Sequence, residues 1–169
     1  MTGLRRLLVA TLGAASLVAF GTSSAAADEG NILISFHTMT PVTGAAVGTV
    51  NDRGIRGGGL PWRITSGTGT VDHQGNVSVS VTGLVLDAGP LAGTNPIPSF
   101  KAIVSCLTPH GVMNVSTGLF PATRPGGDST IVDTVSLPHP CKDPIVFVTS
   151  PTGSWFAKSN ADQRDEDED

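Results

Sequence analysis

Histidine and cysteine are the side chains of this 169-residue chain that would first suggest a metal centre. The four histidines, His37, His73, His110 and His139, stand singly in the sequence. None belongs to an H-x-H, H-E-x-x-H or C-x-x-C pattern, the spacings that place two ligands on one side of a helix or turn. We therefore expect no metal ion and no cofactor.

A hydrolase would need an activated nucleophile or a pair of carboxylates. The nucleophile elbow G-x-S-x-G is absent from the sequence. Glutamate is nearly missing from the body of the chain, so a glycosidase pair would have to come from aspartates, most of which occupy predicted turns. The candidates are Asp52, Asp72, Asp87, Asp128, Asp133 and Asp143. The spacing favours a protein that is not an enzyme; a hydrolase whose catalytic groups converge only in three dimensions is the alternative.

A loop rich in arginine and glycine is the best candidate for ligand binding. Arg53, Arg56 and Arg63 bracket the glycine run 57–59, and Trp62 adjoins it. The run leads into a predicted strand rather than a helix, which is not the arrangement of a nucleotide phosphate loop. Exposed backbone N–H groups and arginines could hold an anion, a glycan or another protein. The other interpretation is a connection in which Trp62 is a core anchor and the arginines are solvated.

Cys106 and Cys141 are the two cysteines of the chain. In an exported protein two thiols are expected to form a disulfide, here closing a loop of about 35 residues worth roughly 3–4 kcal/mol through the unfolded state. A thiol nucleophile or metal ligand is the alternative.

The elements that position these residues read as strands and tight turns. Residues 77–82 alternate Val with Ser or Thr, and Asp72 and Gly75 bound a four-residue hairpin turn before them. The stretches 51–61 and 87–98 are irregular. We predict an all-β, antiparallel β-sandwich, immunoglobulin-like or jelly-roll-like, with about eight short strands and one disulfide, each sheet having one packed and one wet face. The further strands are predicted at 31–36, 62–71, 100–107, 112–117, 130–137, 144–149 and 154–157, the last after a turn at 150–153.

The two ends of the chain differ from the body. Residues 1–27 combine Arg5 and Arg6, an uncharged apolar stretch 7–20 and an Ala-rich end, the pattern of a cleavable signal peptide. Residues 28–159 are predicted to form one β domain, and 160–169 an acidic, disordered tail. We expect a secreted, extracellular protein with no membrane attachment after cleavage.

Composition limits the partners. The net charge is −4, and it belongs to the ends, because the last nine residues hold six acids and one arginine. The nearly neutral body gives no reason to expect nucleic acid. The hydrophobic share of 39% is enough for a core, while 21 Gly and 12 Pro argue against long helices.

The chain resembles small secreted all-β proteins of actinobacteria that carry no assigned function. The segments that carry this resemblance are SFHTMTPVTGAAVGT, GIRGGGLPW, VTGLVLD, GTNPIP with the strand up to VSCL, and PCKDPIVFVTSPTGSWFA. The resemblance implies a secreted β domain with one cysteine pair and brings no activity with it. A fainter similarity, through GNVSVSVTGLVLD, is to chordin-type extracellular β domains.

These observations favour an extracellular binding or structural protein whose partner is an unidentified protein or glycan. A protease inhibitor is a further alternative, in which the prolines and glycines of 87–98 hold that loop extended for a protease cleft.

Overall fold

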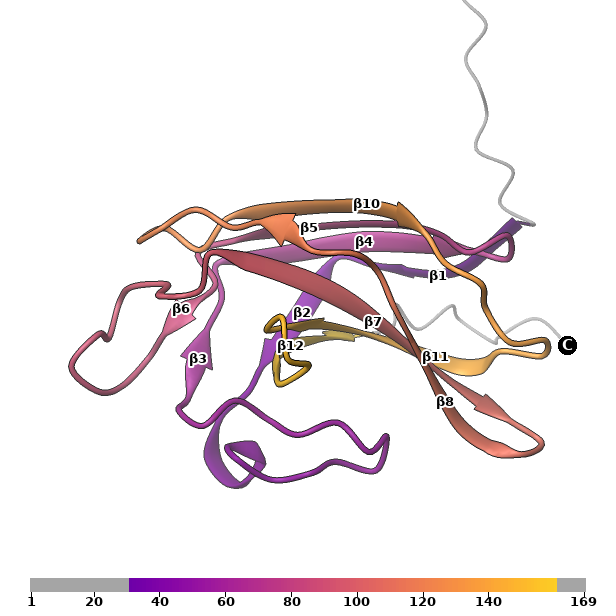
Figure 1. Cartoon of the computed structure of the whole chain (residues 1–169), viewed down its shortest axis with the longest axis horizontal. Helices are drawn as coiled ribbons and strands as arrows, with labels where there is room; N and C mark the ends of the chain where they lie inside the picture. The colour runs from indigo at the N-terminus through magenta and orange to yellow at the C-terminus, as the bar shows by residue number, and fades with distance from the viewer. Residues whose placement is uncertain (1–30, 161–169) are drawn as a thin grey trace, which may run out of the picture.

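The computed structural model describes residues 31–160, and within them the chain folds into two antiparallel β-sheets stacked one above the other (Figure 1). The predicted sandwich with a disulfide is confirmed. One sheet has the order β1-β4-β5-β10, and the other the order β2-β12-β11-β7-β8. The strands of the first sheet are β1 (Ile32–Phe36), β4 (Ser66–Asp72), β5 (Asn76–Thr82) and β10 (Ser129–Thr134).

The second sheet contains the longest strands. Its members are β2 (Thr38–Pro41), β7 (Ser99–Thr108), β8 (Gly111–Ser116), β11 (Lys142–Thr149) and β12 (Trp155–Asn160), and β9 (Phe120–Pro121) pairs with the start of β7. A two-stranded ribbon joins β3 (Trp62–Arg63) to β6 (Val85–Leu86). A single 3₁₀ turn, η2 (Gly44–Ala46), follows β2.

The hairpin between β4 and β5 forms where the sequence predicts it. The Asp72 carboxylate accepts a hydrogen bond from the Asn76 backbone N–H at 2.8 Å, and Gly75 closes the turn with φ of +86°. A Cβ on Gly75 would lie 1.9 Å from the carbonyl oxygen of Val135, so glycine is required there for space as well as for conformation. The three valines of β5 are buried and its polar residues are exposed, as the alternation predicts.

The second sheet departs from the expectation of one wet face. In β7 every residue from Ala102 to Cys106 is buried, although successive side chains point to opposite faces. The 42–61 segment lies on the side of this sheet that looks away from the first sheet (Figure 1), where Arg53 contacts Asp143 of β11 and Asn114 of β8. Its Gly57 also pairs with the edge of β12, through backbone hydrogen bonds from Gly58 N–H to Trp155 O and from Trp155 N–H to Arg56 O, both 2.9 Å. The wet face predicted for each sheet is therefore found on the first sheet and is wrong for the second.

Several strand bounds differ from the prediction. β10 ends at Thr134 rather than 137, because the chain leaves the sheet when the Val135 N–H turns to bond the carbonyl of Gly75 at 2.9 Å. β12 extends to Asn160, which the sequence assigned to the tail. The strands β2, β6 and β9 were not predicted, since segments of two to four residues are too short to show a period. The strand predicted from Trp62 to Val71 is divided in the structure into β3 and β4.

The predicted signal peptide and the rest of the acidic tail lie outside the described residues. Among residues 31–160 no helix has the length and apolar character that crossing a membrane requires.

Candidate functional site

Trp62, one of the four residues of the predicted ligand loop, is part of the core. Its side chain is 3% exposed. The ring stacks on Phe156 with centroids 3.9 Å apart and meets Phe100 edge-on at 6.5 Å. A ligand could reach the face of this ring only if the core opened, so the structure shows the core-anchor alternative for Trp62.

Arg53 is also buried, which the sequence did not indicate. Its guanidinium pairs with the carboxylate of Asp143 and donates to the backbone carbonyl of Asp143 at 3.0 Å. Asn114 on β8 in turn donates its side-chain amide to the carbonyl of Arg53 at 2.8 Å. A buried guanidinium is tolerated only when it has hydrogen-bonding or charged partners. These contacts supply them, and through Arg53 they hold the 42–61 segment against the second sheet.

The remaining two arginines are exposed but do not join Trp62 in one surface. Arg56 donates to the carbonyl of Gly48 within its own segment. Arg63 lies 3.9 Å from the carboxylate of Asp87, an exposed pair of small energetic value. The four residues thus divide into two that are buried and two that face solvent with separate partners.

The glycine run serves close packing. A Cβ on Gly57 would lie 2.2 Å from the carbonyl oxygen of Ala46, and one on Gly58 would lie 3.1 Å from Nε1 of Trp62. The Gly57 N–H donates to Thr49 O at 2.8 Å, and the Gly58 N–H is used by β12. These two N–H groups, which the sequence offered as anion donors, are therefore already occupied.

The predicted disulfide is present. Cys106 near the end of β7 joins Cys141 just before β11, with the two Cα atoms 4.8 Å apart. The bridge links neighbouring strands of one sheet, and Cys106 is fully buried. Neither sulfur serves as a thiol in this structure.

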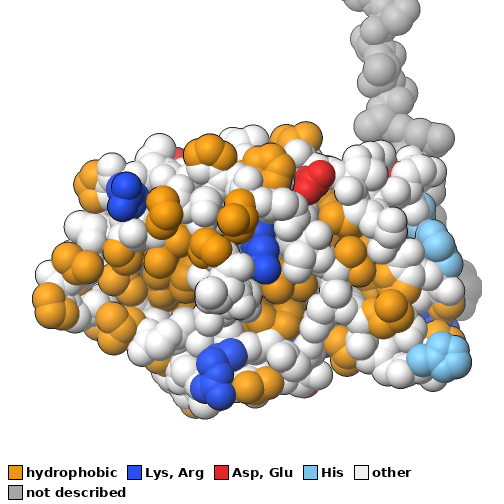
Figure 2. Space-filling model, in the orientation of Figure 1, with side chains coloured by type: hydrophobic (Ala, Val, Ile, Leu, Met, Phe, Trp, Pro, Cys, Tyr) orange, Lys and Arg blue, Asp and Glu red, His pale blue; other side chains and the backbone are white. Residues whose placement is uncertain are grey.

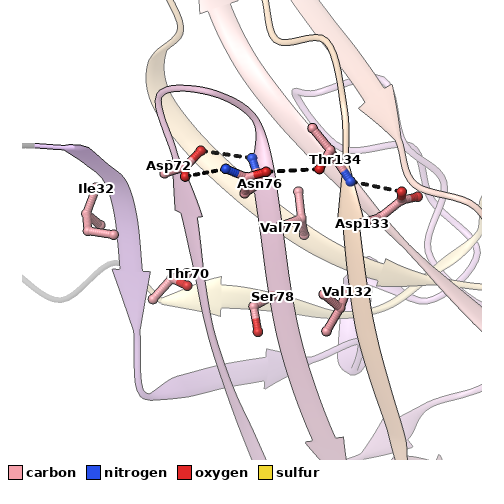
Figure 3. Close-up of a pocket in the computed structure, with 9 residues that line it drawn as sticks. All are labelled: Ile32, Thr70, Asp72, Asn76, Val77, Ser78, Val132, Asp133 and Thr134. Carbon is pink, nitrogen blue, oxygen red and sulfur yellow. Dashed lines mark hydrogen bonds between the residues drawn. The ribbon is translucent and has the colours of Figure 1, made fainter. Parts of the chain in front are cut away.

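A shallow depression of about 470 Å³ lies on the open face of the first sheet (Figure 3). Asp72, Asn76, Thr134 and Asp133 form a chain of polar groups across its rim: the Asn76 amide donates to Asp72 at 2.7 Å, and the Thr134 hydroxyl donates to Asn76 at 2.9 Å. Two aspartates in one hollow are what a glycosidase would require, so their protonation decides what the hollow can do.

Both carboxylates are held in the charged form. Burial acts to raise the pKa of Asp72, but hydrogen bonds from the Asn76 side chain and from backbone N–H groups of the turn outweigh it and lower the pKa. Backbone N–H groups of Gly118 and Thr134 lower the pKa of Asp133. A general acid needs a raised pKa, and neither group has one, so the pair suits capping of the backbone better than acid–base catalysis.

The histidines are dispersed. All four are exposed, and within the described residues no group of three or more His, Cys, Asp or Glu side chains lies close enough to hold a metal ion. A second hollow, of about 330 Å³, has Arg63 on its wall beside glycines and apolar residues and contains no other charged side chain.

Three segments that backbone hydrogen bonds tie to one another carry exposed apolar residues, and we call them together the loop end: Leu60 with its neighbour Pro61, the 87–98 loop and the 117–122 segment. Figure 2 shows hydrophobic side chains concentrated at this end, on the left, over the loop that joins β6 to β7. Leu91 and Leu119 are 53% and 56% exposed, and Leu60 is 42% exposed. Exposed leucines in this number on adjacent loops are the kind of surface that protein partners cover.

Hydrogen bonds make the loop end rigid. Asn95, 2% exposed, donates its side-chain amide to Ile97 O at 2.8 Å and to Thr123 O at 3.0 Å. The Ala122 N–H donates to Pro98 O at 2.9 Å, and the Asp87 N–H to Pro61 O at 2.9 Å. Sequence reasoning missed Asn95; its place beside a proline in an irregular loop was the one available signal.

The 87–98 loop is not extended at its tip. The Gly93 N–H donates to Leu86 O at 2.8 Å, the Thr94 N–H to Leu91 O at 3.0 Å, and Gly89 has φ of +86°. The tip therefore turns back on itself. A protease cleft takes an extended segment, so the geometric premise of the inhibitor alternative is not met at 89–94.

Comparison of the chain with family models, with curated proteins and with solved structures gives no match.

Proposed function

We propose that this protein is an exported, non-enzymatic binding module that docks onto another extracellular protein through its loop end. The observation that carries the proposal is the set of three exposed leucines, Leu60, Leu91 and Leu119, on segments locked by internal hydrogen bonds. Leaving large apolar side chains in water costs solubility, and a rigid apolar surface loses little entropy when a partner covers it.

The chemistry of the loop end favours a protein partner over a glycan. Sugar rings are bound mainly by stacking on exposed aromatic faces, whereas both tryptophans here are buried and the chain has no tyrosine. The exposed groups of the loop end are aliphatic side chains and prolines, with Arg63 and Asp87 at its margin. Such a surface matches an apolar patch rimmed by a few charges.

Two further observations support an extracellular, non-catalytic role. A disulfide persists in oxidising compartments, in agreement with the signal-peptide pattern of residues 1–27. The aspartate pair on the open sheet face has both pKa values lowered, so neither carboxylate of this pair suits the role of general acid.

The test compares an L91D/L119D double variant with the wild-type chain. Each chain, expressed from Met1 and purified in the form that export leaves, is immobilised and exposed to the extracellular proteins of the producing cells. A captured protein is then purified and titrated. Because apolar groups at an interface centre contribute about 1–2 kcal/mol each, the double variant is expected to bind at least about tenfold more weakly.

The matched control is Val132→Asp. Val132, the most exposed large apolar residue among residues 31–160 at 62%, lies on the open face of the first sheet, away from the loop end. This variant should bind as the wild-type chain does. Equal binding by the double variant, or capture of no protein by the wild-type chain, would contradict the proposal.

A further inference from the structure

β8 forms an unprotected edge of the second sheet. Within residues 31–160 it pairs with β7 alone, so its other side presents unpaired backbone N–H and C=O groups. Its six residues contain no charged side chain and no proline, and its register with β7 runs from Ile103 opposite Ser116 to Thr108 opposite Gly111 without a shift. Straight, uncharged edges of this kind are templates for a further strand.

Within residues 31–160, the other three edges of the two stacked sheets carry protection. β2 has four residues and ends at Pro41, which has no N–H. β1 has a register irregularity between Ile32 and Ile34. β10 carries Asp133, whose carboxylate binds the N–H of Gly118 and so draws a neighbouring segment against that edge. The contrast isolates β8 as the edge open to pairing.

Apolar side chains flank this edge on both faces. Leu107 and Val112 stand opposite each other across the β7–β8 pair, and Met113 follows on the other face. Their exposed fractions are 37%, 39% and 47%. An added strand would lie beside β8 and cover part of Val112 and Met113, so backbone pairing and apolar burial would favour the same geometry.

We propose that β8 of one copy pairs antiparallel with β8 of a second copy, joining two sheets into one across a twofold axis. The two strands are then self-complementary, since the same groups face each other in both directions. β8 has no charge, so no like charges oppose one another at the centre of the contact. This pairing goes beyond the proposed docking function and uses a different surface.

The acidic tail does not fit this edge as an occupant. Residues 161–169 contain six acids and no apolar residue beyond Ala161, whereas the edge offers valine, leucine and methionine. Burying that charge against an apolar edge without partners would be costly. A second β8, by contrast, brings apolar side chains and unpaired backbone groups of its own.

Side-chain hydrogen bonds fix the conformation of β8 in the single chain. The Asn114 side chain bonds the carbonyl of Arg53, and the Thr108 hydroxyl donates to Gly111 O at 2.9 Å next to the hairpin turn. Little backbone entropy is therefore lost when a second strand adds. A contact between two six-residue strands is smaller than the roughly 1,200 Å² of a stable interface, so the dimer should be weak and concentration-dependent.

The experiment measures molar mass by sedimentation equilibrium on the exported form of the chain, with the disulfide intact, from about 1 µM to about 1 mM. The wild-type mass should rise from one chain toward two. A V112K/M113K variant, which adds the charge that natural edges use, should raise the dimer dissociation constant about tenfold or more. Val132→Lys, on β10, is the control and should dimerise as the wild-type chain does.

Hydrogen exchange gives a second readout that does not need a variant. Amides of β8 should exchange more slowly at high than at low concentration, while those of β2 should not change. A wild-type chain that stays monomeric at about 1 mM overturns the pairing, and so does a V112K/M113K variant that dimerises normally. Slowed exchange in β8 only after a foreign extracellular protein is added would assign the edge to that partner and also refute the second copy. Capture through the loop end is measured separately, so either proposal can fail alone.

Discussion

Replacing Trp62 by alanine tests whether the arginine–glycine loop is built for binding or for packing. Trp62 is 3% exposed and contacts both Phe156 and Phe100. Truncation of a buried tryptophan costs about 3–5 kcal/mol of unfolding free energy, including the cavity it leaves. A domain of this size has about 5–15 kcal/mol in all, so the expected fall in the melting midpoint is roughly 10–20 °C.

The assay is urea unfolding followed by far-ultraviolet circular dichroism, which does not depend on the tryptophan removed. Trp62→Phe should lose roughly 1–2 kcal/mol, because a ring remains to stack on Phe156. Arg63→Ala, at an exposed ion pair, should change stability by less than about 1 kcal/mol. If Trp62→Ala unfolds within about 1 kcal/mol of the wild-type chain, the packing argument is refuted and a binding role for the ring returns.

Three further predictions concern the backbone and the carboxylates. Reducing the disulfide, which spans a sequence separation of 35, should lower the unfolding free energy by roughly 3–4 kcal/mol, measured with and without reductant; an unchanged midpoint would contradict it. Gly57→Ala should destabilise by about 1–3 kcal/mol because its Cβ would meet backbone oxygen at 2.2 Å, while Gly59→Ala, with nothing within 4 Å, should be nearly neutral in the same melt. The lowered pKa values of Asp72 and Asp133 mean that the unfolded chain binds more protons near the ordinary value of 3.8, so the stability they add is complete above that value and is lost as pH falls through the folded pKa values. Asp133→Asn should flatten this acid limb between about pH 2 and pH 5, and an unchanged limb would show that the carboxylate is not stabilised by folding.

Local features of the fold could be predicted because their causes are local. The β4–β5 hairpin follows from the Val alternation of 77–82 and from an Asp and a Gly at fixed places in the turn. The disulfide follows from having two cysteines and an export pattern. Neither inference requires knowledge of which segments meet across the sandwich.

The loop residues could not be assigned in the same way. Arg53 and Arg56 have the same side chain three positions apart, yet Arg53 is buried against Asp143 and Arg56 is exposed. Their difference depends on a partner 90 residues away in the chain. The covered outer face of the second sheet has the same origin, because the 42–61 segment shows no pattern that says which surface it will cross.

The sequence by itself determined the class of fold, the central hairpin, the cysteine pair and the nearly neutral charge of the body, since periodicity, turn chemistry and composition act over a few residues. Tertiary structure alone decided that Trp62 is a core residue, that Arg53 is buried against Asp143, that Leu91 and Leu119 are exposed, and that β8 is an edge strand. Burial and edge position are relations between distant segments, and a strand of GVMNVS reads the same whether a neighbour covers it or not.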